Sequence, residues 1–320
     1  MQGPRHFVFL VLDGFPHICL SCAIEPLRLA NHLAGRTVYS WGAASLDGAP
    51  VTASNGIETP VQHGLVTLDR RTNLMVIAGD RAVRDAPAEL SAYLRRQRAQ
   101  GAMVGGICSG AYLLARAGLL AGKEAALHWA YHDAFAESFP KVTLTRSLFV
   151  ADKVHPTCSG GTATLDLMLH ILFEDHGRDL ALGVAEQLVC AGMRDATTMQ
   201  RASAQFRSGG CNTLLTRAID LMTSNIETPF AAREIAEEIG ISCRRLERLF
   251  ARHLGVAPMR YAMELRLGRA RNLLLQSEVS ISEIAVACGF SSPSHFSKSF
   301  RARFGHPPRK ARMGQQAKAA

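Results

Sequence analysis

The segment Ile235-Ala-Glu-Glu-Ile-Gly-Ile-Ser242 returns 49 residues later as Ile284-Ala-Val-Ala-Cys-Gly-Phe-Ser291. Each copy predicts a short helix that ends at a glycine, which can take the left-handed conformation of a sharp turn. The serine that closes each copy is a good N-cap for a following helix. The repeat therefore predicts two helix-turn-helix units in one all-α domain.

The second helix of each predicted unit has one apolar face and one polar face. The apolar stripes are Leu246, Leu249, Phe250 and Leu254 in the first unit, and Phe296, Phe300 and Phe304 in the second. Such a helix can pack its apolar side on a partner helix and offer its polar side to the major groove of DNA. The polar side chains that we predict to bind DNA are Arg244, Arg245, Arg248, Ser294, His295 and Lys298. One such face alone could be merely solvated, but two copies at matched spacing favour DNA binding.

Charge is divided unevenly along the 320 residues. After residue 210 the chain has 17 Lys and Arg against 9 Asp and Glu, whereas residues 1–210 have 19 against 18. A basic module on a nearly neutral body indicates an anionic polymer as its partner. Double-stranded DNA fits better than a membrane surface, because the basic residues lie on two patterned helices rather than on one amphipathic face.

Residues from about 213 to 312 closely resemble the DNA-binding domain of the AraC/XylS family. The matching segments are Arg266–Leu274, Ile284–Phe290 and Ser294–Phe300, followed by Phe304-Gly305. One departure is Ala311 before Arg312, where the family usually has a tyrosine, so the closing anchor of the domain is in question. The resemblance implies a sequence-specific transcription regulator. Between the two units, residues 261–276 predict a long helix that would connect them rigidly.

The first part of the chain alternates short apolar strands with helical patterns. Predicted strands are 7–12, 38–44, 74–78 and 103–107, and predicted helices include 20–33, 88–100, 109–117 and 162–175. This alternation is typical of an α/β doubly wound parallel sheet, in which ligands bind beyond the carboxyl ends of the strands. We predict a sensing domain over 1–200, a linker over 201–212, a DNA-binding domain over 213–312 and a flexible tail over 313–320.

One predicted strand runs into Gly105-Gly-Ile-Cys-Ser-Gly110 and then directly into a helix. The flanking glycines let the chain turn sharply and hold Cys108 in a strained elbow. A helix N-terminus behind the sulfur would favour the Cys108 thiolate. Together with His128 and Glu25, Cys108 could form a cluster of cysteine, histidine and carboxylate.

This elbow resembles that of the class I glutamine amidotransferase-like superfamily, in its ThiJ/PfpI branch. Joined to an AraC-type domain, it is similar to the GlxA group of regulators, as are the segments Asp13–Phe15, Ile24–Asn31 and Cys158–Asp166. The resemblance implies a sensing and dimerisation domain rather than an enzyme, and an effector derived from an amino acid, such as arginine, carnitine or glycine betaine. Ser109 stands where catalytic ThiJ/PfpI proteases have histidine, and His155-Pro-Thr157 does not complete a glutaminase triad.

We predict that the effector meets residues at the strand ends, namely Asp13, Phe15, Glu25, Cys108, Ser109, His128 and Trp129. Trp129 either packs half-buried or forms a cation–π wall for a quaternary ammonium, together with Phe15 or Tyr131. Cys108 either lines the site or keeps some reactivity, as a redox sensor or as the nucleophile of a hydrolase or hydratase with a DNA-targeting tail. Cys108, Glu25 and His128 are therefore only vestigial candidates for catalysis.

Other functions find less support in the sequence. Cys19 and Cys22 lack a second pair for a zinc site, and His128 with His132 lacks a third ligand, so neither a metal nor a cofactor is predicted. No apolar run reaches the roughly 20 residues of a membrane span, and the apolar segment 7–12 is too short for a signal peptide, which predicts a cytoplasmic protein. The expected partners are DNA, a small effector, a second copy of the chain and, for an activator, RNA polymerase.

Overall fold

The computed structural model describes residues 3–190, 192–198, 200, 213–277 and 279–316. The chain forms two compact units, Met1–Gln200 and Arg201–Ala320. The predicted linker, 201–212, lies outside the described residues, as do residues 317–320 of the predicted tail. Residues 313–316 continue helix α15 (Pro308–Gln316), which packs against helix α12 (Pro258–Gln276), and the flexible tail stays a prediction.

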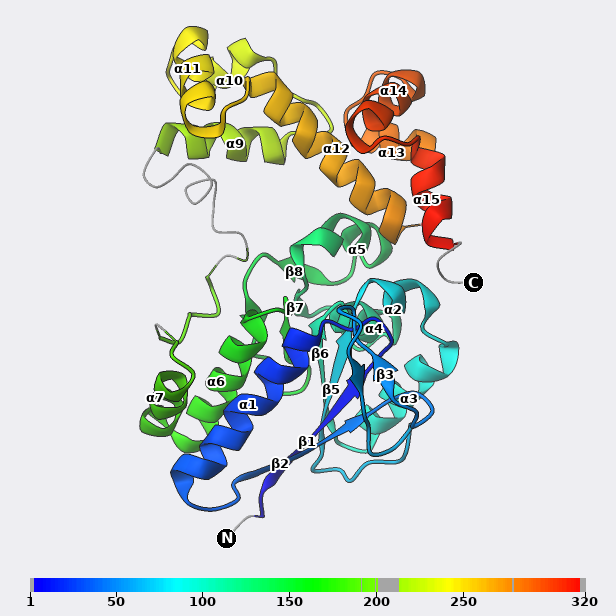
Figure 1. The fold of residues 1–320 in the computed structure, drawn as a ribbon, viewed down its shortest axis with the longest axis vertical. Coiled ribbons are helices and arrows are strands. Elements are labelled where there is room, and N and C mark those ends of the chain that lie inside the picture. The colour runs from blue at the N-terminus through cyan, green and yellow to red at the C-terminus, as the bar shows by residue number, and fades with distance from the viewer. Residues whose placement is uncertain (1–2, 191, 199, 201–212, 278, 317–320) are drawn as a thin grey trace. The chain divides into compact units, whose positions relative to one another are not determined.

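The first unit contains a six-stranded sheet with the strand order β2-β1-β5-β6-β10-β9 (Figure 1). Neighbouring strands are parallel except β9, which pairs antiparallel with β10. Their bounds are β1 Arg5–Val11, β2 Tyr39–Ala44, β5 Asn73–Ala78, β6 Met103–Cys108, β9 Phe149–Val150 and β10 Thr157–Cys158. Two short ribbons lie outside this sheet, β3 (Val51–Thr52) with β4 (Glu58–Thr59), and β7 (Glu124–Ala126) with β8 (Thr143–Thr145). The predicted parallel sheet is confirmed.

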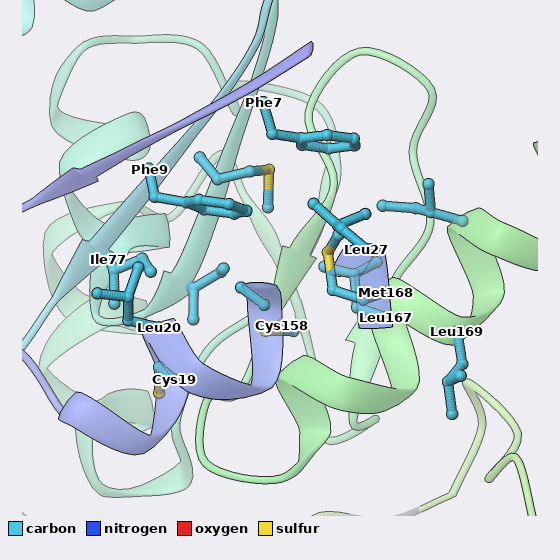
Figure 2. Close-up of a cluster of buried hydrophobic side chains, with 14 of the residues drawn as sticks. Phe7, Phe9, Cys19, Leu20, Leu27, Ile77, Cys158, Leu167, Met168 and Leu169 are labelled. Carbon is cyan, nitrogen blue, oxygen red and sulfur yellow. The ribbon is translucent and has the colours of Figure 1, made fainter. Parts of the chain in front are cut away.

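Helices cover both faces of the sheet, as the doubly wound prediction requires. Successive side chains of a strand point to opposite faces, so Phe7 and Phe9 join one core while Val8 and Leu10 join the other. Figure 2 shows Phe7 and Phe9 in the first core, which also contains Leu27 of α1. Helices α1 (His17–Ala34), α6 (Ala163–His176) and α7 (Arg178–Gln187) pack together there. The second core is built with α2 (Asp80–Asp85), α3 (Ala88–Ala99), α4 (Gly110–Arg116), η1 (Trp129–Tyr131) and α5 (His132–Ser138).

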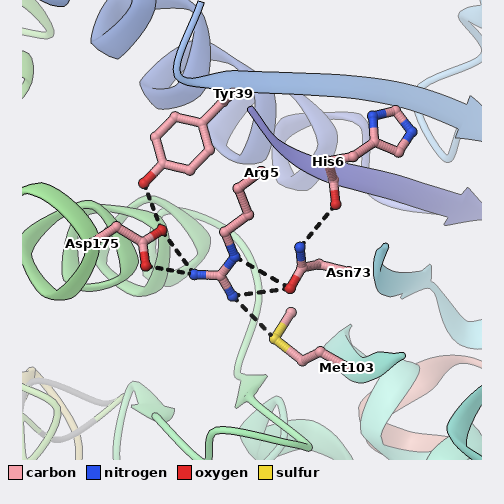
Figure 3. A network of polar contacts seen from close by, with 6 residues as sticks. All are labelled: Arg5, His6, Tyr39, Asn73, Met103 and Asp175. Atoms are coloured by element: carbon pink, nitrogen blue, oxygen red, sulfur yellow. Dashed lines mark hydrogen bonds and ion pairs between the residues drawn. The ribbon is translucent and has the colours of Figure 1, made fainter. Parts of the chain in front are cut away.

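A polar network closes the amino-terminal edge of the sheet, away from the predicted site (Figure 3). The Arg5 guanidinium donates to both carboxylate oxygens of Asp175 at 2.8 Å, and through Nε and Nη2 to Oδ1 of Asn73 at 3.2 and 3.0 Å. The Tyr39 hydroxyl donates to Asp175 at 2.7 Å. The network therefore ties the starts of β1, β2 and β5 to the end of α6, and its role is structural.

The second unit is all helical and contains the two predicted helix-turn-helix units. Helices α10 (Ala232–Glu238) and α11 (Cys243–Leu254) form the first, and α13 (Ile281–Ala287) and α14 (Pro293–Phe304) form the second; α9 (Thr213–Ser224) precedes both. The predicted serine cap is confirmed in the first unit, whereas the cap in the second unit is Ser292, one residue after the serine that closes the repeat. Ser242 Oγ accepts from the Arg245 N–H at 3.3 Å, and Ser292 Oγ accepts from the His295 N–H at 3.2 Å. Both turn glycines, Gly240 and Gly289, have positive φ angles of 73° and 69°.

Helix α12 begins at Pro258, before the predicted start at Tyr261. It contacts helices of both helix-turn-helix units. Its Arg266 donates from Nε to the Cys288 carbonyl oxygen at 2.8 Å and from Nη2 to the Gly289 carbonyl oxygen at 2.5 Å. The same guanidinium lies 4.2 Å from the centre of the Phe290 ring. The connecting helix thus holds the turn of the second unit directly.

The closing helix α15 is anchored without the tyrosine that is usual in the AraC/XylS family. Arg312 Nη2 donates to the carbonyl oxygen of Val279, just before α13, at 2.5 Å. Helix α15 also packs against α14 as well as α12. The departure at Ala311 therefore leaves an anchor that is made by the next residue, Arg312.

Candidate functional site

The basic face of helix α11 is the first candidate contact surface for DNA. Its apolar residues Leu246 and Phe250 are fully buried in the core of the first helix-turn-helix unit. Leu249 and Leu254, at the edge of the stripe, are half-buried. On the polar side, Arg244, Arg245 and Arg248 are all exposed, as is Arg252. The division of faces that the spacing predicts is therefore present, and the three predicted side chains of this helix lie on its solvent side.

Helix α14 presents an equivalent face in the second helix-turn-helix unit. Phe296 and Phe300 are fully buried and pack edge to face, with ring centres 5.6 Å apart. The predicted contact residues Ser294, His295 and Lys298 are exposed, and the His295 ring lies edge-on to Phe290 at 5.6 Å. These three side chains therefore also occupy the solvent side of the recognition helix.

A basic hollow beside Lys298 adds a residue that sequence reasoning missed. Arg301 lies one helical turn beyond Lys298, is exposed, and lines with it a hollow of about 600 Å³. The remaining walls are Ser297, Ala302, Gly305 and Pro307. The (i, i+3) spacing from Lys298 could have identified Arg301, because residues three apart share one face of a helix. Two cations around a shallow hollow suit the phosphate backbone of DNA.

In the first unit, the carboxyl ends of β1, β5 and β6 meet. Gly14, after β1, packs so closely on Gly79, after β5, that a Cβ on Gly79 would collide with the Gly14 carbonyl oxygen. Ser109, after β6, is fully buried and donates from its hydroxyl to the Gly79 carbonyl oxygen at 2.8 Å. Asp13 is exposed and pairs with Arg81 at 2.6 Å. The predicted Asp13 and Ser109 thus belong to one neighbourhood, but Ser109 holds the backbone rather than facing solvent.

An aromatic and acidic cluster adjoins this neighbourhood through Asp80. The Tyr131 hydroxyl donates to the Asp80 carboxylate. The negative charge of Asp80 also interacts electrostatically with His128. The His128 ring lies 5.2 Å from the Trp129 ring and 6.0 Å from the Tyr131 ring. Burial lowers the pKa of His128 below its usual value, which disfavours the charged form of the imidazole. Trp129 is 41% exposed, which leaves part of its ring available to a small ligand.

Sequence reasoning missed Asp80, although it directly follows Gly79 at the end of a predicted strand. That position was the available signal, because polar residues at the carboxyl ends of parallel strands collect at one edge of the sheet. We therefore place Asp80 with His128, Trp129 and Tyr131 in what we call the strand-end cluster.

Two predicted ligand residues have other surroundings. Phe15 is fully buried in the core, so its ring is not a wall of an open site. Glu25 lies on α1 and accepts two hydrogen bonds from the Arg28 guanidinium, at 2.7 and 2.8 Å. The suggested cluster of Cys108, His128 and Glu25 is not formed, because Glu25 pairs with its own helix and His128 with the strand-end cluster.

The elbow at Cys108 has the predicted strained geometry. Cys108 has a φ angle of +59°, a left-handed conformation that residues with a side chain rarely adopt. A Cβ on Gly110 would collide with the Val76 carbonyl oxygen, and one on Gly106 would lie 2.5 Å from the Ala111 nitrogen. Glycine at both positions therefore lets α4 start directly against the ends of β5 and β6.

The prediction that the elbow favours a Cys108 thiolate is wrong. The Cys108 thiol hydrogen-bonds to Cys19 of α1, and this bond together with burial raises the pKa of Cys108 well above its usual value. The same bond, with the N–H of Gly161, lowers the pKa of Cys19. A helix N-terminus behind the sulfur does not compensate, because Cys108 is only 7% exposed and faces a second thiol.

Metal binding and membrane insertion find no support in the described part of the chain. Among these residues, no three His, Cys, Asp or Glu side chains are grouped so that they could hold a metal ion. Across the same described ranges, none of the helices has the length and apolar character that crossing a membrane requires.

Comparison with known proteins identifies both units. A helix-turn-helix domain family matches residues 235–314, and the DJ-1/PfpI family matches residues 6–174. The HTH-type transcriptional regulator GbdR of Pseudomonas aeruginosa is 40% identical over 314 residues, which cover 98% of this chain and 86% of that protein. The regulator GlxA of Rhizobium meliloti is 37% identical over 301 residues, 94% of this chain and 93% of its own length.

A solved structure agrees with the first unit. The AraC family transcriptional regulator from Pseudomonas putida matches with a TM-score of 0.52 and 28% identity, over 58% of this chain and all of that one. The predicted resemblance to GlxA-type regulators is thereby confirmed, and the protein is a DNA-binding transcription regulator. The chain belongs to the family of HTH-type transcriptional regulators that join a DJ-1/PfpI-type α/β domain to an AraC-type DNA-binding domain.

Proposed function

We propose that the chain is a cytoplasmic activator that responds to a small cationic or zwitterionic metabolite derived from an amino acid, such as arginine, carnitine or glycine betaine. The observation that carries this proposal is the strand-end cluster, in which the Asp80 carboxylate adjoins the exposed Trp129 ring through His128 and Tyr131. A carboxylate beside an aromatic face suits a quaternary ammonium or guanidinium group. The cluster also lies where α/β sheets collect their ligands.

Hydrogen bonds inside the sensing unit connect the loop beside this cluster with the last residue of that unit. Gln200, its last residue, donates from Nε2 to the carbonyl oxygens of Leu127 at 2.8 Å and Ser147 at 2.9 Å. Leu127 directly precedes His128 and Trp129. A ligand that displaces this loop would therefore change the hydrogen bonds of the residue from which the chain leaves the sensing unit. Its binding energy for one arrangement over the other would shift the population of DNA-engaging states.

The segment before Gln200 is also clamped to the sensing unit. Arg194 donates to the buried Asp166 carboxylate of α6, at 2.6 Å from Nη2, and to the Thr162 hydroxyl at 2.9 Å. A displacement at Leu127 would thus be confined to the residues after this clamp.

We further propose that the regulator works as a homodimer and that it contacts RNA polymerase as an activator.

Calorimetry with the full chain tests the effector proposal. Glycine betaine, carnitine and arginine are titrated separately, and we expect at least one to release or absorb heat on binding. The Trp129→Ala variant should weaken that binding roughly 2- to 30-fold, because a cation–π contact contributes about 0.5–2 kcal/mol. Phe173→Ala, which removes another aromatic side chain of 40% exposure, is the matched control and should leave the affinity unchanged. Absence of heat for all three compounds would reject this effector class.

We also propose that the first unit is a sensor rather than an enzyme, because Cys108 has a raised pKa and a thiol partner instead of a base. The rival is a cysteine hydrolase or hydratase with a DNA-targeting tail. The Cys108→Ser variant should keep DNA affinity and effector response within about twofold, measured by fluorescence anisotropy and a reporter gene, because serine is close to cysteine in size and a sensor needs no reaction at the sulfur. The enzyme would be favoured if the wild type shows a hydrolytic turnover and the variant loses both that turnover and the effector response.

A further inference from the structure

Three buried thiols from three elements gather beneath the elbow. They are Cys19 on α1, Cys108 at the end of β6 and Cys158 at the end of β10. Cys19 and Cys158 are fully buried, and Cys108 is 7% exposed. Figure 2 shows Cys19 and Cys158 in the core between the sheet and α1. In the sequence, Cys19 and Cys158 have the character of small apolar core residues, so nothing there connects them with Cys108.

One turn holds two of these sulfurs in place. The Gly161 N–H donates to Cys19 Sγ at 3.1 Å. The neighbouring Gly160 packs so tightly on Cys108 that a Cβ there would lie 2.6 Å from the Cys108 Cβ and 3.1 Å from its Sγ. The Cys19 and Cys108 thiols hydrogen-bond to each other. The same turn therefore lies against both sulfurs and holds them next to each other.

The pair is chemically unequal. Cys19 accepts from both a backbone N–H and the Cys108 thiol, and these donors lower its pKa and favour its thiolate. Cys158 differs, since burial raises its pKa to about 12, and its thiol donates to the Thr164 hydroxyl at 3.7 Å. Two neighbouring thiols with opposite pKa shifts thus share one turn, and neighbouring thiols form a disulfide after one sulfur is oxidised.

We propose that Cys19 and Cys108 form a reversible disulfide when the protein meets a hydroperoxide. The Cys19 thiolate attacks the peroxide, an S–O bond forms, the O–O bond breaks, and water or an alcohol leaves after protonation. Cys108 then attacks the Cys19 sulfur of the sulfenic acid, the S–S bond forms and the S–O bond breaks. Hydroxide leaves with the Cys108 proton as water, so the peroxide is reduced by two electrons and the two thiols are oxidised.

The disulfide would link helix α1 covalently to the elbow. Closing the bond requires the sulfurs to approach from hydrogen-bond contact to about 2.05 Å. The elbow continues into Ser109, whose hydroxyl holds Gly79 beside Asp80. Oxidation would therefore act on the backbone that supports the strand-end cluster. The modification itself does not depend on the effector proposal.

Peptide mapping of the full chain tests this assignment. The protein is treated with hydrogen peroxide, free thiols are blocked by alkylation, and tryptic peptides are sequenced by mass spectrometry. Cys19 and Cys22 fall on one tryptic peptide, so the work uses the Cys22→Ser background, in which a linked peptide identifies Cys19 alone. We expect a Cys19–Cys108 linked peptide that dithiothreitol removes. Cys288, fully buried in the second unit, is the internal control and should stay reduced.

Variants separate this pair from the third thiol. Cys19→Ser should reduce the linked peptide to background, whereas Cys158→Ser should leave it at the parent level. A Cys108–Cys158 link, a sulfinic acid on Cys108 with Cys19 still reduced, or two reduced thiols under peroxide that oxidises the half-buried Cys190 would each overturn the proposal. Mapping of the parent protein decides these outcomes even if a variant does not fold.

Discussion

The Gly289→Ala variant is expected to destabilise the DNA-binding unit by about 2–5 kcal/mol, from the left-handed backbone and from overpacking together. Gly289 has a φ angle of +69°, and its added Cβ would collide with the Ile226 carbonyl oxygen. The same Cβ would lie 2.9 Å from the Glu227 carbonyl oxygen and from Cδ of Pro229. Backbone atoms on the opposing side cannot move aside cheaply, so the turn and the loop before α10 must both shift.

Gly240→Ala is the matched control, because Gly240 is the equivalent turn residue of the first unit. Its φ angle is +73°, but a Cβ there would meet nothing within 4 Å. We expect a loss of only about 1–2 kcal/mol, from the left-handed backbone alone. Urea denaturation of the full chain, followed by circular dichroism of the helical unit, measures the difference. Equal losses of unfolding free energy for the two variants would contradict the packing of the Gly289 turn on the loop that precedes α10.

The second large effect is expected for DNA affinity. Arg248→Ala should weaken binding by about 1–3 kcal/mol, or roughly 5- to 150-fold, if the guanidinium pairs with a base. Lys298→Ala should weaken binding to all sequences about equally and lower the salt slope by about 1, since a lysine at a phosphate releases one counterion. Fluorescence anisotropy over a salt series, on a fragment selected by repeated binding and amplification, measures both.

A double variant tests whether both units bind the same DNA. Arg248 and Lys298 lie in different helix-turn-helix units, so their losses should add when both units engage one site. Arg178→Ala, which removes an exposed arginine of the sensing unit, should leave the affinity unchanged. If the double variant is no weaker than Arg248→Ala alone, α14 is not part of the interface.

Much of the fold was predictable because its signals are local. Two turn glycines followed by capping serines, and apolar stripes such as Leu246 with Phe250, specify where helices begin, end and pack. Short apolar runs such as residues 74–78, separated by helical patterns, specify a parallel sheet. The exposed faces of α11 and α14 follow from the same periodicity, since a residue opposite a buried stripe must face solvent.

The sensing site was harder to predict, because its members are far apart in the chain. Cys108 was identifiable from its flanking glycines, but its partner Cys19 comes from another element, and the suggested Glu25 pairs with Arg28 instead. Asp80, at the start of α2, and Tyr131, in η1, likewise meet only because these two distant elements pack side by side. Spacing along the chain offers no signal for such contacts.

The two turn glycines mark the boundary between the two kinds of information. Both are recognisable from sequence, because a left-handed turn after a helix favours glycine wherever it occurs. Only the tertiary structure distinguishes them, since the loop from Ile226 to Pro229 and the Arg266 guanidinium lie against Gly289, while the space beside Gly240 is open. Backbone conformation is a property of a few neighbouring residues, whereas the atoms that surround a turn depend on how distant segments pack.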